Sequence, residues 1–201
     1  MDRSNGYEEI AAEFIAARGS HRSTGVGVRH VQKWAQVLPK GAAVIDIGCG
    51  PGLPLTGVLL AEGLNVFGVD ASPTLVQAFQ RNLPDTPVVC EPVQESRFFD
   101  RTFDAALAWG LIFLLSPDDQ RRLIQRLAGI LGPGGRLLFT SPAKRCDWSD
   151  AMTKQESRSL GAEEYGELLS KAGFSLEREY EDEGQNHYFE ATRTSTGTQP
   201  L

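Results

Sequence analysis

Three glycines and one acidic residue lie close together in the sequence VIDIGCGPG, residues 44–52. Asp46 precedes Gly48 by two positions, and Gly50 and Gly52 follow at alternate positions. Glycine permits positive φ angles and lets the backbone approach a bound ligand closely. A carboxylate beside such a loop repels phosphate groups and attracts a cation. The stretch therefore predicts a binding site for a ligand that carries positive charge.

This loop differs from the loops that bind dinucleotides. Their pattern G-x-G-x-x-G requires a glycine three positions after the second one, whereas this chain has Leu53 there. NAD also carries a pyrophosphate, which binds to backbone N–H groups and would be repelled by Asp46. Both observations disfavour an NAD-dependent oxidoreductase.

Strand and helix patterns alternate along most of the chain. The helix after the glycine loop closes at Gly63, and two later helices begin with a serine cap and a proline, at residues 72–73 and 116–117. The sequence GPGG at residues 132–135 is expected to end the second of these helices before the next strand. The expected strands occupy residues 42–48, 64–70, 86–90, 103–109, 136–141, 174–182 and 186–193.

This alternation predicts an α/β fold: a doubly wound, mostly parallel, seven-stranded and Rossmann-like sheet with helices on both faces. Only a short turn around Gly184 joins the last two strands, so the last strand is expected to be antiparallel. Two amphipathic helices are expected earlier, the first beginning near Tyr7. Ligands bind such sheets at the carboxyl ends of the strands, where the strand order reverses. The glycine loop leaves the first strand at that edge.

Composition narrows the classes of partner. The 201 residues carry a net charge of −6, with a pI near 5.1, which weighs against nucleic acid as the main partner. No apolar run approaches the length of a membrane span, and the acidic start is not expected to be a signal peptide. Three widely spaced cysteines predict a reducing, cytoplasmic setting and no metal site.

Five features in order resemble the class I S-adenosylmethionine-dependent methyltransferases. The first is VIDIGCGPG, since the family's first motif is D/E-x-G-x-G-x-G. The others are FGVDAS with its acid at Asp70, RTFDAALAW, LGPGGRLLFTSP and the closing hairpin. The resemblance covers about residues 24–193. It implies S-adenosylmethionine as the cofactor and S-adenosylhomocysteine as the product.

The resemblance also assigns the cofactor contacts. Asp70 takes the place of the acid that binds both ribose hydroxyls, although this acid alone would suit NAD as well. The chain departs from the family after the third strand, where the adenine-binding acid is replaced by the sequence CEPVQES. The residues expected to contact the cofactor are Asp46, Gly48, Cys49, Gly50, Gly52, Asp70, Ala71, Ser72, Val93, Gln94, Ala108 and Trp109.

The methyl acceptor is expected to be a small molecule. The fourth strand ends in AWGL and lacks the N/D-P-P-Y/F motif of enzymes that methylate amino groups in nucleic acids. The expected regions are an N-terminal helical lid (1–38), a cofactor-binding core (39–193) with an acceptor cap at 140–160, and a flexible tail (194–201). Residues expected to meet the acceptor or form the lid are Tyr7, Phe14, Arg18, Trp148, His187 and Tyr188.

Catalysis places little demand on side chains here. Methyl transfer depends on alignment and desolvation, and it needs a general base only when the acceptor must lose a proton. His187 is the candidate base, with a strand position facing solvent as the alternative. Trp109 is the second candidate catalytic residue, at the methyl-transfer end, with a place in the core as its alternative.

Two other functions remain compatible with the sequence. One is a non-catalytic module that binds S-adenosylmethionine without turnover. The other is a different alkyl transfer from a sulfonium on the same fold. The sequence leaves open the acceptor atom, the pathway, and whether the protein is a monomer or a homodimer.

Overall fold

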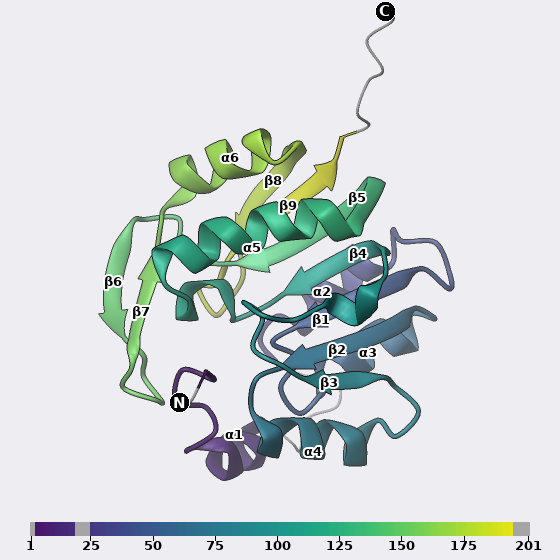
Figure 1. Ribbon diagram of the computed structural model, residues 1–201, viewed down its shortest axis with the longest axis vertical. Coiled ribbons are helices and arrows are strands. Elements are labelled where there is room, and N and C mark those ends of the chain that lie inside the picture. Colours follow the sequence, from purple (N-terminus) through teal and green to yellow (C-terminus); the bar gives the residue numbers. More distant parts are fainter. Residues whose placement is uncertain (1–2, 19–24, 195–201) are drawn as a thin grey trace, which may run out of the picture.

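The computed structural model describes residues 3–18 and 25–194 (Figure 1). The helices are α1 (Ala11–Arg18), α2 (Val28–Ala35), α3 (Leu55–Ala61), α4 (Pro73–Asn82), α5 (Pro117–Ile130) and α6 (Ala162–Lys171), with short 3₁₀ turns at Phe98–Asp100 and Ile112–Leu114. The strands are β1 (Ala43–Ile47), β2 (Asn65–Asp70), β3 (Val88–Cys90), β4 (Phe103–Ala108), β5 (Leu131–Thr140), β6 (Cys146–Ser149), β7 (Glu156–Ser159), β8 (Phe174–Glu181) and β9 (His187–Arg193).

Seven strands form the main sheet in the order β3-β2-β1-β4-β5-β9-β8. β9 is antiparallel to both of its neighbours, and the pairs from β3 to β5 are parallel. The predicted doubly wound sheet with an antiparallel last strand is confirmed. The strand order reverses between β1 and β4, so the exits of these two strands flank the crevice where such sheets bind ligands.

Alternating side chains divide the core between the two faces of the sheet. In β1, Val44 packs with residues of α2 and α3, whereas Ile45 and Ile47 join the cluster that holds α5 and α6. In β5, Leu138 and Phe139 divide in the same way. Successive side chains of a strand point to opposite faces, and helices therefore cover both faces, as predicted from the alternation.

Two element boundaries differ from those expected. The first helix begins at Ala11 and not near Tyr7, because residues 5–10 form turns, in which Asn5 and Gly6 have φ angles of 54° and 84°. β5 begins at Leu131, where Leu131 pairs with Phe103 across a register shift. The GPGG sequence therefore lies within an irregular strand and does not separate a helix from it.

Residues 140–160 form a small structure of their own. β6 and β7 pair as a two-stranded antiparallel sheet beside the exit of β5 (Figure 1). Trp148 on β6 packs against Phe113, with ring centroids 5.4 Å apart. The hairpin is thus anchored on the turn after β4.

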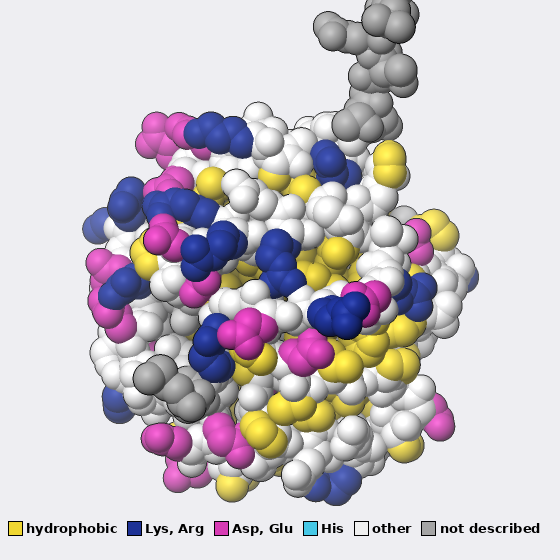
Figure 2. Space-filling model, in the orientation of Figure 1, with side chains coloured by type: hydrophobic (Ala, Val, Ile, Leu, Met, Phe, Trp, Pro, Cys, Tyr) yellow, Lys and Arg dark blue, Asp and Glu magenta, His cyan; other side chains and the backbone are white. Residues whose placement is uncertain are grey.

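Charged side chains of both signs mix on the face of the molecule that carries α5 and α6 (Figure 2). Arg121 reaches Glu164 at 2.6 Å, and Arg122 reaches Asp119 at 2.6 Å. Positive charge on this face is therefore balanced locally.

No helix in the described part of the chain is long and apolar enough to cross a membrane. The expected tail falls almost wholly on residues 195–201, which lie outside the described residues.

Candidate functional site

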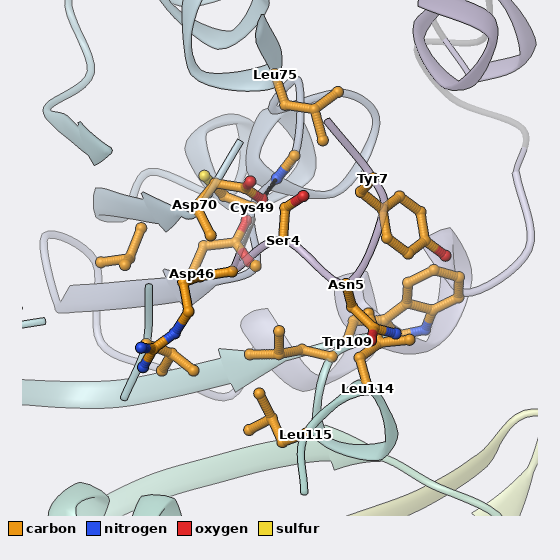
Figure 3. A pocket seen from close by; sticks show the side chains of 18 of the residues that line it. Ser4, Asn5, Tyr7, Asp46, Cys49, Asp70, Leu75, Trp109, Leu114 and Leu115 are labelled. Carbon is orange, nitrogen blue, oxygen red and sulfur yellow. Dashed lines mark hydrogen bonds between the residues drawn. The ribbon is translucent and has the colours of Figure 1, made fainter. Parts of the chain in front are cut away.

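A cavity of about 410 Å³ opens at the carboxyl ends of β1, β2 and β4 (Figure 3). Its floor is the glycine loop, one side follows β2 and β3, and the other side follows the exit of β4. Residues before and within α1 close it from above. Of the residues expected to contact the cofactor, those that line the cavity are Asp46, Gly48, Cys49, Gly50, Asp70, Ala71, Val93, Gln94 and Trp109.

Asp70 organises the glycine loop. Its carboxylate accepts hydrogen bonds from Gly50 N at 2.8 Å and from Ser72 N at 2.9 Å. Burial raises the pKa of Asp70, although the backbone hydrogen bonds oppose the rise. A carboxylate oxygen has room for a second donor, and the ribose hydroxyls of a nucleoside are donors of that kind. Gly48 and Gly50 have φ angles of 73° and 54°, which glycine adopts without strain.

Asp46 lies at the bottom of the cavity and is 3% exposed. Its carboxylate accepts a hydrogen bond from the Thr56 hydroxyl at 2.6 Å. Burial raises the pKa of Asp46 from 3.8 to about 6, with a further rise from the nearby Asp70. A cation bound beside Asp46 would favour its ionised form. The electrostatics therefore suit a positively charged ligand, as the sequence predicted.

Cys49 lies between the two carboxylates. Burial raises the pKa of its thiol, and the negative charges of Asp70 and Asp46 raise it further. A thiol with a raised pKa is a poor nucleophile at neutral pH. Cys49 is therefore suited to fill space in the loop and not to react.

The side of the cavity beyond Asp70 is an apolar slot with one open polar atom. Ala71, Leu75 and Val93 line it. In the part of the chain that the structure describes, Gln94 Oε1 is buried without a hydrogen-bond partner. Such an atom carries a desolvation cost that a ligand N–H would relieve. The slot fits a flat, apolar group with an amino donor, such as adenine.

The opposite side begins at Trp109, where β4 ends. The indole Nε1 of Trp109 donates to Tyr188 Oη at 2.9 Å, and Tyr188 donates to Asp182 Oδ2 at 2.8 Å. Asp182 also accepts from Asn186 Nδ2 and from the Gly184 N–H. Although burial opposes it, these hydrogen bonds hold the pKa of Asp182 below its usual range. The chain of bonds fixes the Trp109 ring and brings Asn186 to the cavity wall.

The N-terminal segment is attached to α4 through one carboxylate. Glu8 accepts hydrogen bonds from the Ser72 hydroxyl, from Thr74 N at 3.1 Å and from Thr74 Oγ1 at 2.7 Å. Tyr7 and Phe14, whose rings lie 5.2 Å apart in an edge-to-face arrangement, line the cavity from above. The two aromatic residues expected in the lid therefore face the site.

Three residues expected to contact the cofactor lie behind the cavity wall. A Cβ on Gly52 would meet Leu83 at 2.7 Å, so its glycine is explained by packing against α4. Ser72 is fully buried as the cap of α4 and accepts from Leu75 N at 3.1 Å. Ala108 is fully buried in the core. None of the three is among the lining residues.

The residues expected at the acceptor divide in the same way. His187 does not line the cavity. Its Nε2 lies 2.9 Å from Oε2 of Glu179 on β8, the strand that pairs with β9. Tyr188 and Trp148 support Trp109 and Phe113 from behind and are not lining residues themselves. The side chain of Arg18 lies outside what the structure describes.

Several lining residues were not anticipated. Among them are Arg3, Ser4 and Asn5 before α1, and Leu111, Phe113, Leu114 and Leu115 after β4. The Asn-Gly pair in the sequence SNGY is a turn pattern that could have indicated a structured segment, but nothing in it indicated the surface on which the segment packs. Within the described residues, no three His, Cys, Asp or Glu side chains are grouped as metal ligands.

Residues 44–135 match the family model of the methyltransferase domain. An uncharacterized methyltransferase of Mycobacterium tuberculosis (strain ATCC 25618 / H37Rv) is 33% identical over 118 residues, which are 56% of this chain and 46% of that protein. An aklanonic acid methyltransferase of Streptomyces sp. (strain C5) is 30% identical over 151 residues, 71% of this chain and 62% of that one. This chain thus matches about half of the length of the first relative.

Solved structures share the fold. The Burkholderia thailandensis 1,6-didemethyltoxoflavin-N1-methyltransferase, with S-adenosylhomocysteine and its acceptor bound, has a TM-score of 0.68 and 24% identity and covers 92% of this chain and 88% of its own. A [4+2]-cyclase has a TM-score of 0.76 and 17% identity and covers 98% of both chains. At these low identities the similarity shows only that the fold is shared, and the reaction has to be inferred from the residues of the site.

Proposed function

The chain belongs to the class I S-adenosylmethionine-dependent methyltransferase family, and from that premise we propose that it transfers a methyl group from S-adenosylmethionine to a small molecule. The observation that carries this proposal is the shape of the cavity. The glycine loop and Asp70 form one end, and an aromatic and aliphatic wall around Trp109 forms the other. One space therefore has room for a nucleoside and for a second, apolar molecule.

The residues present fit the cofactor. Asp70 would hold the ribose hydroxyls, the slot of Ala71, Val93 and Gln94 would hold adenine, and Asp46 would lie near the positively charged end. When bound, the cofactor would supply a methyl group on a sulfonium; the acceptor nucleophile would bond to the methyl carbon while the carbon–sulfur bond breaks and S-adenosylhomocysteine leaves. The buried Oε1 atom of Gln94, which has no hydrogen-bond partner among the described residues, supports this placement.

This chain's own contribution would be alignment and exclusion of water. Phe14 and Tyr7 cover the cavity, and a Cβ on Gly50 would lie 3.6 Å from the Phe14 ring, so the lid lies directly over the loop. Leu111, Leu114 and the Trp109 ring present an apolar surface to the acceptor. Alignment and desolvation are the effects that a displacement at an already activated carbon needs.

The acceptor class rests on two observations. The lining residues near Trp109 are mainly aromatic and aliphatic, which suits a flat or apolar small molecule. Two relatives carry small molecules in their names: an aklanonic acid methyltransferase and a ubiquinone biosynthesis O-methyltransferase. We propose the same class for this protein.

The free cysteines Cys49, Cys90 and Cys146 support a cytoplasmic setting as part of the proposal.

A second candidate is a reaction other than methyl transfer in the same cavity. The likeness to a [4+2]-cyclase favours keeping it, because that protein has this fold and a different reaction in its name. A cofactor that remains unconsumed while an acceptor is converted would indicate this alternative.

Calorimetric titration with S-adenosylmethionine, S-adenosylhomocysteine and NAD tests the proposal. We expect the first two to bind and NAD not to bind. A release assay for S-adenosylhomocysteine with flat aromatic acceptors then separates methyl transfer from binding alone. NAD binding without binding of the other two ligands would contradict the proposed function.

A further inference from the structure

Residues Ser4, Asn5, Gly6 and Tyr7 form a tight turn above the cavity. Asn5 and Gly6 both have positive φ angles, 54° and 84°, and Tyr7 N donates to Ser4 O at 3.2 Å. Positive φ at both central positions is the pattern of a type I′ turn, for which Asn-Gly is the preferred pair. The turn places Asn5 at its corner with little conformational freedom.

The structure holds this turn on two sides. On one side Glu8, whose N–H donates to Ser4 Oγ at 2.9 Å, reaches across to the start of α4 through Thr74. On the other side, Gly6 packs against Thr153 in the β6–β7 turn, where an added Cβ would approach Thr153 Cβ to 3.1 Å. Asn5 is therefore supported by two elements that are distant in sequence.

The side chain of Asn5 has an unused donor. Asn5 lines the cavity, and its Nδ2 is buried with no hydrogen-bond partner within residues 3–18 and 25–194. In Figure 3 the side chain extends toward Trp109 and Leu114, whereas Asp46 and Asp70 lie across the cavity. An orphaned buried donor carries a desolvation cost, so the site is suited to a ligand that brings an oxygen atom to Asn5.

We propose that Asn5 binds the α-carboxylate of the cofactor's methionine portion. This inference rests on the proposed function. The cofactor carries an ammonium and a carboxylate on the same carbon, and two aspartates repel the carboxylate from their side of the cavity. Asn5 offers an N–H donor on the opposite side, near the strand exit at Trp109. A charge-assisted hydrogen bond of this kind is stronger than a neutral one.

The test compares two ligands that differ only in the carboxylate. They are S-adenosylhomocysteine and its decarboxylated form, S-adenosyl-3-thiopropylamine. The variants are Asn5→Gly, which keeps the positive φ angle and removes the amide, and Asn5→Asp, which replaces the donor by a negative charge. Asn65→Asp is the matched control, because Asn65 is exposed at the start of β2 and does not line the cavity.

We expect Asn5→Gly to weaken S-adenosylhomocysteine binding about ten- to a hundredfold and to leave the decarboxylated ligand within about twofold. Asn5→Asp should weaken S-adenosylhomocysteine further, whereas Asn65→Asp should change neither ligand. Equal losses for both ligands would show a structural role and overturn the inference. Unchanged binding of S-adenosylhomocysteine in both Asn5 variants would overturn it as well. If the wild-type protein binds neither ligand, the proposed function itself fails.

Discussion

The glycine loop and the segment of residues 4–14 line the same cavity, but different interactions hold them. The loop is an exit from β1, and it is fixed by backbone hydrogen bonds, such as those that Gly48 N and Cys49 N donate to Val69 O. The N-terminal segment is fixed by side chains that reach other elements, with Glu8 bonded to residues 72 and 74. The wall formed by the glycine loop is thus part of the sheet, whereas the wall formed by the N-terminal segment is attached to the rest of the fold by side-chain contacts.

The two walls are therefore suited to different tasks, namely binding of a ligand and control of its access to the cavity. A wall built from adjacent strand exits keeps its geometry as long as the sheet is folded, because the strands fix its backbone. A wall attached through a few side-chain contacts can open at a lower free-energy cost than global unfolding. The first wall is suited to hold the cofactor, and the second is suited to admit and cover it. Substitutions in the two walls should therefore have different consequences.

The largest effect is expected from Asp70→Ala, which acts on the fixed wall. The change removes a carboxylate that holds Gly50 and Ser72 and would bind both ribose hydroxyls. We expect S-adenosylhomocysteine binding to weaken by about 4 kcal/mol, close to a thousandfold. Calorimetric titration measures this loss, and thermal unfolding controls for the fold. Unchanged affinity would contradict the placement of the ribose.

Asp46→Asn tests the electrostatics of the same wall. Because the pKa of Asp46 rises from 3.8 to about 6 on folding, the folded state binds a proton between these pH values that the unfolded state does not. The free energy of unfolding therefore falls as pH rises through this window, by up to about 3 kcal/mol.

The Asp46→Asn variant lacks this loss of stability. We expect it to be more stable than wild type above pH 6, with the difference vanishing near pH 4, while its affinity for S-adenosylmethionine falls. Urea unfolding of both proteins across this range measures the effect. A stability difference that does not depend on pH would contradict the assignment.

Glu8→Ala acts on the attached wall and should have a smaller effect. It removes the contacts with the start of α4, which are comparable to a helix cap worth about 1 kcal/mol. We expect S-adenosylhomocysteine to dissociate about fivefold faster, with greater hydrogen exchange at residues 3–18. Glu9→Ala is the matched control, because Glu9 is exposed. An equal effect of both substitutions would mean that Glu8 does not hold the segment.

His187→Ala should have the smallest effect. The imidazole pairs with Glu179 and does not line the cavity. We expect the affinity for S-adenosylhomocysteine to stay within about twofold, and the free energy of unfolding to change by about 1 kcal/mol, as for the loss of one hydrogen bond. A loss of turnover in this variant, once an acceptor is known, would restore His187 as a base.

The sequence was sufficient for features that depend on backbone geometry. Glycines at alternate positions after a buried strand, and an acid at the end of the next strand, predicted the floor of the cavity. Strand and helix alternation predicted the doubly wound sheet. These patterns can be read because parallel strands bring consecutive exits to one edge.

The tertiary structure decided which side chains face the cavity. Gly52 shares its spacing with Gly48 and Gly50 but packs against α4, and Ser72, which was predicted as a helix cap, is buried and does not line the cavity. Asn5 and Glu8 gave no periodic pattern, because their segment is held by contacts with α4 and with the β6–β7 turn, which lie far along the chain. The sequence by itself therefore determined the fold and the seat for the cofactor. The closing wall depended on long-range side-chain packing, which local spacing does not encode.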